Sequence, residues 1–214
     1  MARDRDVVAF DQRAAAYEEG YLGQMHRQIA DRTADLALGC EPRPRRVLDV
    51  GCGTGYLLRQ LAVRAPDADE LIGIDAAPAM IRVAQGKAGE DRRVRFAIGV
   101  SEQLPFPAAT FDLVVSTTSF DHWVDQLAGL AECARVITPG GHLVLVDQFS
   151  PWLRPTLIGA RRDKARTRSR ATRLLARAGF TSWQWHHLYA LIIGAVTATS
   201  PGPGTPGRTG DAAT

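Results

Sequence analysis

Cysteines, long apolar runs and an excess of charge of one sign are all scarce in this 214-residue sequence. Its three cysteines, Cys40, Cys52 and Cys133, are an odd number without the spacing of metal ligands. The longest apolar run, LYALIIGAV at residues 188–196, has about half the length that a bilayer span requires. The first residues, MARDRDVV, are charged and lack the apolar core of a signal peptide. These absences predict a cytoplasmic protein with reduced thiols and no membrane span.

The charge balance gives little support to an acidic macromolecular partner. The formal net charge is only +3, and 45% of the residues are hydrophobic, as in an ordinary globular domain. The basic segment 154–177 has no interleaved aromatic residues, so we interpret it as the solvated face of an amphipathic helix and not as a nucleic-acid platform. His186 and His187 are adjacent but have no cysteine or carboxylate partners at ligand spacing, which predicts no metal site. Nothing in the pattern specifies an oligomeric state.

From residue 46 onward, short apolar segments alternate with segments of helical period. The apolar segments are 46–50, 71–75, 94–99, 111–117 and 142–148, and helical patterns lie at 56–65, 77–88 and 125–136. Such alternation is typical of a parallel sheet with right-handed crossovers. The PGG sequence at residues 139–141 predicts a turn before the fifth strand.

The C-terminal third has a looser pattern. A basic helix is predicted at residues 165–178, and it is closed by Gly179. Two apolar stretches, 181–189 and 190–199, are consistent with an edge hairpin of the same sheet. We therefore predict an α/β fold, a doubly wound and mostly parallel seven-stranded sheet of Rossmann-like type with helices on both faces.

The two ends of the chain differ from this central region. Residues 7–38 show helical spacing, and a connector with Gly and two prolines follows. We therefore predict an N-terminal helical cap and connector at residues 1–44 and one main domain at residues 45–199. The tail, residues 200–214, is rich in Pro, Gly and Thr and has nothing to bury, so it is predicted to be disordered.

A glycine-rich loop follows the first strand in the sequence VLDVGCGTGYLL, residues 47–58. Glycines allow a tight turn and let bare backbone approach a ligand. Tyr56 breaks the G-x-G-x-x-G spacing of dinucleotide sites, and the G-x-x-x-x-G-K-[ST] pattern of phosphate-binding loops is missing. Asp75 ends the second strand, where a carboxylate can accept hydrogen bonds from both hydroxyls of a ribose. Loop and acid together predict a bound nucleoside with a free 2′,3′-diol.

Four ordered motifs resemble those of the class I S-adenosylmethionine-dependent methyltransferases, in particular the small-molecule branch with the ubiquinone/menaquinone-type domain. They are VLDVGCGTG, IGIDAAPAMI, GVSEQLPFPAATFDLVVS and ECARVITPGGHLVLVD, and they lie between residues 45 and 148. The resemblance implies S-adenosyl-L-methionine as the cofactor and a small organic molecule as the methyl acceptor. It gives no support to a nucleic-acid acceptor, because the fourth strand is followed by neither an N-P-P-Y-type motif nor a target-recognition insert.

The resemblance also implies roles for individual residues. Asp49 and the loop backbone would hold the methionine portion, Asp75 would bind the ribose diol, and side chains beside the adenine would contact that ring. Tyr17, on the N-terminal helical segment, would close over the cofactor. The complete cofactor set is Tyr17, Asp49, Gly51, Cys52, Gly53, Gly55, Asp75, Ala76, Met80, Ser101, Glu102, Gln103 and Ser116. One departure is Val100, which stands where relatives commonly carry an acid that bonds the adenine amino group.

The candidate catalytic residues lie in SFDHWVD, after the fourth strand. His122 is a candidate general base because histidine as a residue type can lose and regain a proton near neutral pH, with shape or substrate positioning as the alternative. Asp121 either pairs with His122 or caps the next helix, and we expect the cap. Phe120, Trp123 and Trp152 favour an aromatic or apolar acceptor. A protein that binds the cofactor without turnover is the remaining alternative.

Overall fold

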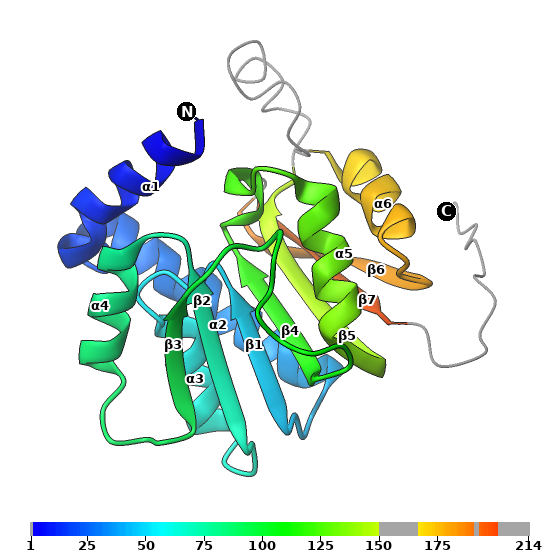
Figure 1. Cartoon of the computed structure of the whole chain (residues 1–214), viewed down its shortest axis with the longest axis horizontal. Coiled ribbons are helices and arrows are strands. Elements are labelled where there is room, and N and C mark those ends of the chain that lie inside the picture. Colours follow the sequence, from blue (N-terminus) through cyan, green and yellow to red (C-terminus); the bar gives the residue numbers. More distant parts are fainter. Residues whose placement is uncertain (1, 150–166, 191–192, 201–214) are drawn as a thin grey trace.

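The structure, a computed structural model, describes residues 2–149, 167–190 and 193–200, and side chains from residue 7 onward. Seven strands form one sheet: β1 (Arg46–Val50), β2 (Glu70–Asp75), β3 (Val94–Ile98), β4 (Phe111–Thr117), β5 (Ile137–Gln148), β6 (Ser182–Tyr189) and β7 (Ile193–Thr199). Their order in the sheet is β3-β2-β1-β4-β5-β7-β6 (Figure 1). The first five are parallel, whereas β7 is antiparallel to both of its neighbours. The predicted doubly wound, mostly parallel sheet is confirmed.

Helices cover both faces of this sheet. They are α1 (Ala2–Arg13), α2 (Gly20–Cys40), α3 (Tyr56–Arg64), α4 (Pro78–Lys87), α5 (Gln126–Val136) and α6 (Arg168–Arg177), with short 3₁₀ helices η1 (Ala14–Ala16) and η2 (Phe120–His122). The apolar sides of α2, α3 and α4 share one core cluster with the sheet, and those of α5 and α6 share the other. Figure 1 shows α5 and α6 in front of the sheet and α2 and α3 behind it.

The central strands are apolar along their length because both faces of the sheet are covered. In β1, Val47 packs into the cluster on the α2 side and Leu48 into the cluster on the α5 side. In β4, Leu113 packs into the cluster on the α2 side and Val114 into the cluster on the α5 side. The side chains of all four residues are fully buried. This alternation fixes the register of each strand, since a one-residue slip would exchange the two cores.

The fifth strand begins earlier than the sequence predicts. The PGG sequence at residues 139–141 lies inside β5, which starts at Ile137. The pairing with β4 jumps from Phe111–Ile137 to Leu113–His142, so the intervening residues bulge out of the ladder. Gly140 adopts a φ of +82°, which suits a glycine in such a bulge. The predicted turn is therefore an irregularity within one strand.

The C-terminal hairpin is present, but its first strand, β6, is the edge of the sheet, and β7 lies inside it. Helix α6 ends just before Gly179, which has a φ of +98°, as a closing glycine requires. The start of the basic helix predicted at 165–178, Trp152 and the tail from residue 201 lie outside the described residues. The division of the chain at residues 44 and 199 stays a prediction. Along the described part of the chain, no helix is both long and apolar enough to cross a bilayer.

Candidate functional site

The glycine loop joins β1 to α3 and turns with left-handed backbone conformations. Gly51 and Gly55 both have a φ of +76°, a region that other residues rarely adopt. A Cβ at Gly51 would overlap the Ser119 hydroxyl, and a Cβ at Gly55 would overlap the ring of Phe96. The amides of Gly51 and Cys52 donate to the carbonyl of Ile74 at 2.8 and 2.9 Å, which fixes the loop against β2. The loop therefore needs glycine for its conformation and for close packing.

Asp75 ends β2 next to this loop, and its carboxylate organises the surrounding backbone. Its Oδ2 accepts a hydrogen bond from the amide of Gly53 at 2.9 Å, and its Oδ1 accepts one from the amide of Ala77 at 2.8 Å. Burial, the largest cause, raises the pKa of Asp75 despite these two amides. Each carboxylate oxygen retains acceptor capacity beyond one amide, so the group is both oriented and able to accept from a ligand.

Asp49 lies in β1 and is only 2% exposed. Burial raises the pKa of this carboxyl to about 8, and the nearby charge of Asp75 raises it further. No ion pair involving Asp49 occurs among the described residues, so its charged form lacks a protein cation. A positively charged ligand group close to the glycine loop would stabilise the ionised form.

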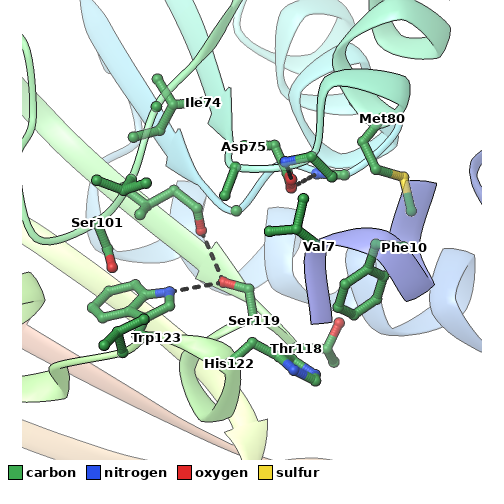
Figure 2. Close-up of a pocket in the computed structure, with 18 of the residues that line it drawn as sticks. Val7, Phe10, Ile74, Asp75, Met80, Ser101, Thr118, Ser119, His122 and Trp123 are labelled. Carbon is green, nitrogen blue, oxygen red and sulfur yellow. Dashed lines mark hydrogen bonds between the residues drawn. The ribbon is translucent and has the colours of Figure 1, made fainter. Parts of the chain in front are cut away.

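A pocket opens above the carboxyl ends of β1, β2 and β4, where ligands bind in open parallel sheets (Figure 2). The empty space within it, including space open to solvent, is about 800 Å³. The residues of the predicted set that line it are Tyr17, Gly51, Gly53, Asp75, Ala76, Met80, Ser101, Glu102 and His122. Those that do not line it are Asp49, Cys52, Gly55, Gln103, Ser116 and Asp121.

The N-terminal segment covers one side of the pocket. Val7 and Phe10 of α1 line it together with Tyr17. The ring of Tyr17 stacks on His26 with a centroid distance of 4.9 Å and an interplanar angle of 22°. Burial, more than the charge of Asp75, raises the pKa of Tyr17 to about 12, while a hydrogen bond with Thr118 acts in the opposite direction. Tyr17 is therefore held as a neutral phenol across the mouth of the glycine loop.

Two consecutive residues after β4 take opposite sides of the pocket. The His122 ring meets Phe10 edge-on at 4.9 Å, near Thr118, whereas the Trp123 indole lies next to Ser101 (Figure 2). Figure 2 also shows that the Ser119 side chain lies between them. Thr118 itself has a φ of +52°, a strained conformation for a β-branched residue and a frequent feature of binding sites.

His122 is paired with the acid that precedes it. Its Nε2 lies 3.2 Å from Oδ1 of Asp121, which is 8% exposed. The expectation that Asp121 caps the following helix is wrong, because Asp125 is the cap of α5 and accepts from the amides of Leu127 and Ala128 at 3.0 Å each. Asp125 stands directly before the helix, where a cap can reach those amides, and Asp121 stands four residues too early.

Ser116 was expected at the cofactor, but its hydroxyl instead contacts that of Ser119 at 2.9 Å. Ser119 Oγ donates to the carbonyl of Val50 at 3.1 Å and accepts from Nε1 of Trp123 at 3.2 Å. One hydroxyl thus joins the end of β1, the end of β4 and the segment that carries the indole. Phe120 is fully buried in the core and does not line the pocket, so it says nothing about the acceptor.

Sequence reasoning assigned no role to part of the lining. These residues are Val7, Val50, Ile74, Ala77, Gly99, Thr117, Thr118, Ser119 and Val124. Several lie at or directly after a strand end, so the rule that ligands bind at the carboxyl ends of strands would have included them. Val7 of α1 and Val124, between η2 and α5, approach the pocket in a way that only the tertiary structure reveals. Among the described residues, no group of three or more His, Cys, Asp or Glu side chains could hold a metal ion.

Residues 47–141 match the family model of a methyltransferase domain. A demethylmenaquinone methyltransferase from Deinococcus radiodurans is 44% identical over 121 residues, which are 56% of this chain and 49% of that protein. A malonyl-[acyl-carrier protein] O-methyltransferase from Halorhodospira halophila is 36% identical over 159 residues, which are 73% of this chain and 52% of that protein. The chain thus spans about half the length of the curated relatives it matches.

Solved structures show the same fold. The crystal structure of a SAM-dependent methyltransferase from Aquifex aeolicus superposes with a TM-score of 0.71, and the match covers 89% of this chain and 98% of that one at 17% identity. The strand order, the glycine loop after β1 and the acid that ends β2 agree with the resemblance seen in the motifs. Residues 47–141 thus match a methyltransferase domain, and the chain has the fold of solved SAM-dependent methyltransferase structures.

Proposed function

We propose that this pocket binds S-adenosyl-L-methionine and that the protein transfers its methyl group to a small, uncharged acceptor with an apolar body. The observation that carries the proposal is the pairing of Asp75 with the glycine loop, because Asp75, whose two carboxylate oxygens each accept a backbone amide, lines the pocket beside the bare backbone of Gly51 and Gly53. Asp75 receives the ribose hydroxyls. The backbone from Gly51 to Gly53, with Asp49 behind it, holds the methionine end, and Asp49 favours its ammonium group.

The rest of the cofactor set has supporting roles. Ala76 and Met80, at the start of α4, contact one side of the base, and the turn at Ser101 and Glu102 closes the pocket beyond it. Tyr17 covers the methionine end. Cys52 and Gly55 shape the glycine loop from the side away from the pocket. Gln103 supports the turn, since its backbone N–H donates to the carbonyl of Val100 at 3.3 Å. Bound S-adenosylmethionine supplies an activated methyl on a sulfonium, so the chain mainly has to orient the acceptor and exclude water.

Apolar walls and the absence of basic side chains support an uncharged acceptor. Val7, Phe10 and Val124 line the pocket, and none of its described lining residues is Lys or Arg. The carboxylate acceptor named for the Halorhodospira relative would call for a nearby cation, whereas a quinone-type acceptor of the kind named for the Deinococcus relative would not. We therefore favour a neutral aromatic or otherwise apolar acceptor.

For His122 we propose a proton-accepting role when the acceptor is a hydroxyl. Oδ1 of Asp121 lies 3.2 Å from Nε2 and orients the imidazole, as a buried carboxylate does in other acid–base pairs. Phe10 packs edge-on against the ring and restricts its rotation. For an acceptor that is already acidic, the same pair would only shape the pocket.

Calorimetric titration with S-adenosylmethionine and S-adenosylhomocysteine tests the cofactor site. Asp75→Ala should weaken both ligands about 30- to 150-fold, because hydrogen bonds to a charged group contribute about 2–3 kcal/mol. Asp67→Ala is the matched control, since this exposed acid precedes β2 at the opposite end of the sheet. Equal affinity of wild type and Asp75→Ala would refute the ribose assignment.

A screen of phenols, quinols and carboxylic acids with methyl-labelled cofactor then tests the acceptor. Label should appear in neutral aromatic or apolar compounds. Transfer only to carboxylic acids would refute the acceptor class, and tight cofactor binding without any transfer would indicate a binding protein. Transfer to RNA or DNA would indicate a nucleic-acid methyltransferase.

A further inference from the structure

The turn that follows β3, in the connection to β4, begins at Gly99 and closes the end of the pocket beyond Asp75. Gly99, Val100, Ser101 and Glu102 all line this end, together with Ile74. A nucleoside whose ribose is held by Asp75 has its base here, so this inference rests on the proposed function. The side chains of the turn decide which groups can meet the edge of the base.

Val100 brings only an apolar side chain to this end. Its backbone carbonyl, the one acceptor it could offer, receives a hydrogen bond from the amide of Gln103 at 3.3 Å. The isopropyl side chain of Val100 gives an exocyclic amino group no hydrogen bond, but it packs well against a methyl group.

Among residues 99–103, Glu102 has the only ionisable carboxyl group, and one oxygen of this carboxylate already accepts hydrogen bonds from two backbone amides. Its Oε1 accepts from the amide of Val124 at 2.6 Å and from the amide of Asp125 at 3.1 Å. These two bonds draw the side chain to the start of α5. The pocket is thereby closed by a contact between two loops, and the acid acts as part of that closure.

The hydroxyl of Ser101 is also turned away from the base. A Cβ built on Gly129 of α5 would lie 3.1 Å from Ser101 Oγ and still closer to the indole of Trp123, so Ser101 faces α5 and the indole. Figure 2 shows the Ser101 hydroxyl above the Trp123 ring. The indole N–H points to Ser119. Each polar side chain around this end is thus directed elsewhere in the fold.

We propose that the site does not read the 6-amino group of the cofactor's purine, and that Val100 is the residue that sets this tolerance. The expected ligands are S-adenosyl compounds that carry a hydrogen or an alkylated nitrogen at purine C6. The purine ring nitrogens are unchanged in these compounds, so only the contribution of the amino group is compared.

Calorimetry with S-adenosylhomocysteine, its N6-methyl analogue and its 6-deamino (purine) analogue tests the proposal without any acceptor. Wild type should bind the three ligands with dissociation constants within about tenfold of one another, because no hydrogen bond is lost. A site that uses a hydrogen bond to the amino group would reject the deamino analogue far more strongly. A wild-type preference for S-adenosylhomocysteine of 100-fold or more would overturn the proposal.

Val100→Asp tests whether a carboxylate at this position adds recognition of the 6-amino group. Its carboxylate should accept from the amino group, tighten S-adenosylhomocysteine and widen its preference over both analogues at least tenfold relative to wild type. Val100→Leu keeps the position apolar and should leave the preference unchanged. A Val100→Asp variant that is folded by circular dichroism and binds all three ligands as wild type does would overturn the assignment of Val100.

Glu102→Gln addresses the remaining carboxylate. It should leave the relative affinities of the three ligands unchanged, and a loss of preference for the 6-amino compound would overturn the proposal by making Glu102 the reader. If wild type binds none of the three ligands, the proposed function itself fails, a result distinct from binding with strong discrimination.

Discussion

Oδ1 of Asp11 lies 2.7 Å from the backbone nitrogen of Ala79, so a residue of α1 caps the start of α4 from outside that helix. Ala77, the N-cap residue of α4, has no side chain that could cap this helix, and Pro78 occupies the first helical position. This bond, together with the apolar contacts between the two segments and the ion pair between Glu18 and Lys87, ties the N-terminal segment that lines the pocket to the helix that follows Asp75.

Asp11→Ala should loosen α1 while leaving the sheet intact. Loss of a side-chain cap costs about 1 kcal/mol, which raises the open population of the segment about fivefold. Limited trypsin digestion should therefore cleave after Arg13 about fivefold faster than in wild type. Asp11→Asn retains the acceptor oxygen and should behave as wild type. Equal cleavage rates of all three proteins would show that the bond between Asp11 and Ala79 does not hold α1 in place.

Ligand binding should release a proton from Asp49. Burial holds its pKa at about 8, so the carboxyl is mostly protonated at pH 7, and a ligand ammonium beside it lowers that pKa. Titration of S-adenosylhomocysteine at pH 7 in phosphate and in Tris should reveal release of close to one proton, about 0.9. Asp49→Asn should bind with no buffer dependence, whereas an unchanged dependence would exclude Asp49 as the source.

The same carboxyl should make the ligand-free protein less stable as the pH rises. Between the ordinary carboxyl pKa of 3.8 and about 8, Asp49 is protonated in the folded chain and ionised in the unfolded chain. The folded state then binds more protons, so the free energy of unfolding falls by up to about 1.4 kcal/mol per pH unit. Urea unfolding of wild type and Asp49→Asn should be measured at pH 5 and 7.5. The free energy of unfolding of Asp49→Asn, relative to that of wild type, should be higher at pH 7.5 than at pH 5.

Ser119→Ala should destabilise the fold more than Ser116→Ala. The first change removes the hydroxyl that bonds Val50, Ser116 and Trp123, and the second removes one partner of that hydroxyl. At about 1 kcal/mol per hydrogen bond, we expect losses of about 3 and 1 kcal/mol in denaturant unfolding. Equal losses would mean that Ser119 is not the centre of the network.

Gly51→Ala should abolish cofactor binding in a protein that still folds. The added Cβ meets Ser119, and the φ of +76° is strained for alanine. Gly86→Ala is the control because its Cβ, in the last turn of α4, would meet nothing within 4 Å. S-adenosylhomocysteine should fail to bind the first variant and bind the second as tightly as wild type.

The sequence was sufficient to predict the sheet and the glycine loop because both depend on local patterns. Strands buried on both faces read as apolar runs, and the turns of Gly51 and Gly55 require glycine itself. The partners of short polar side chains were not predictable in this way. Ser119 bonds Val50, 69 residues away, and Asp121 and Asp125 differ as helix caps only by where α5 begins. Such choices depend on tertiary contacts and on helix boundaries, which sequence patterns locate least well.

Helix α2 has a consequence for any attempt to work with a shortened protein. Its buried residues Ile29, Ala34 and Ala37 belong to the same core as Val47 of β1, and Arg32 donates to the carbonyl of Leu188 at 2.6 Å. A fragment that starts at Arg45 would expose to water the part of the sheet face that α2 covers, over β4, β5 and β6, and would be prone to aggregate. The smallest autonomous folding unit of this chain therefore reaches back to the beginning of α2.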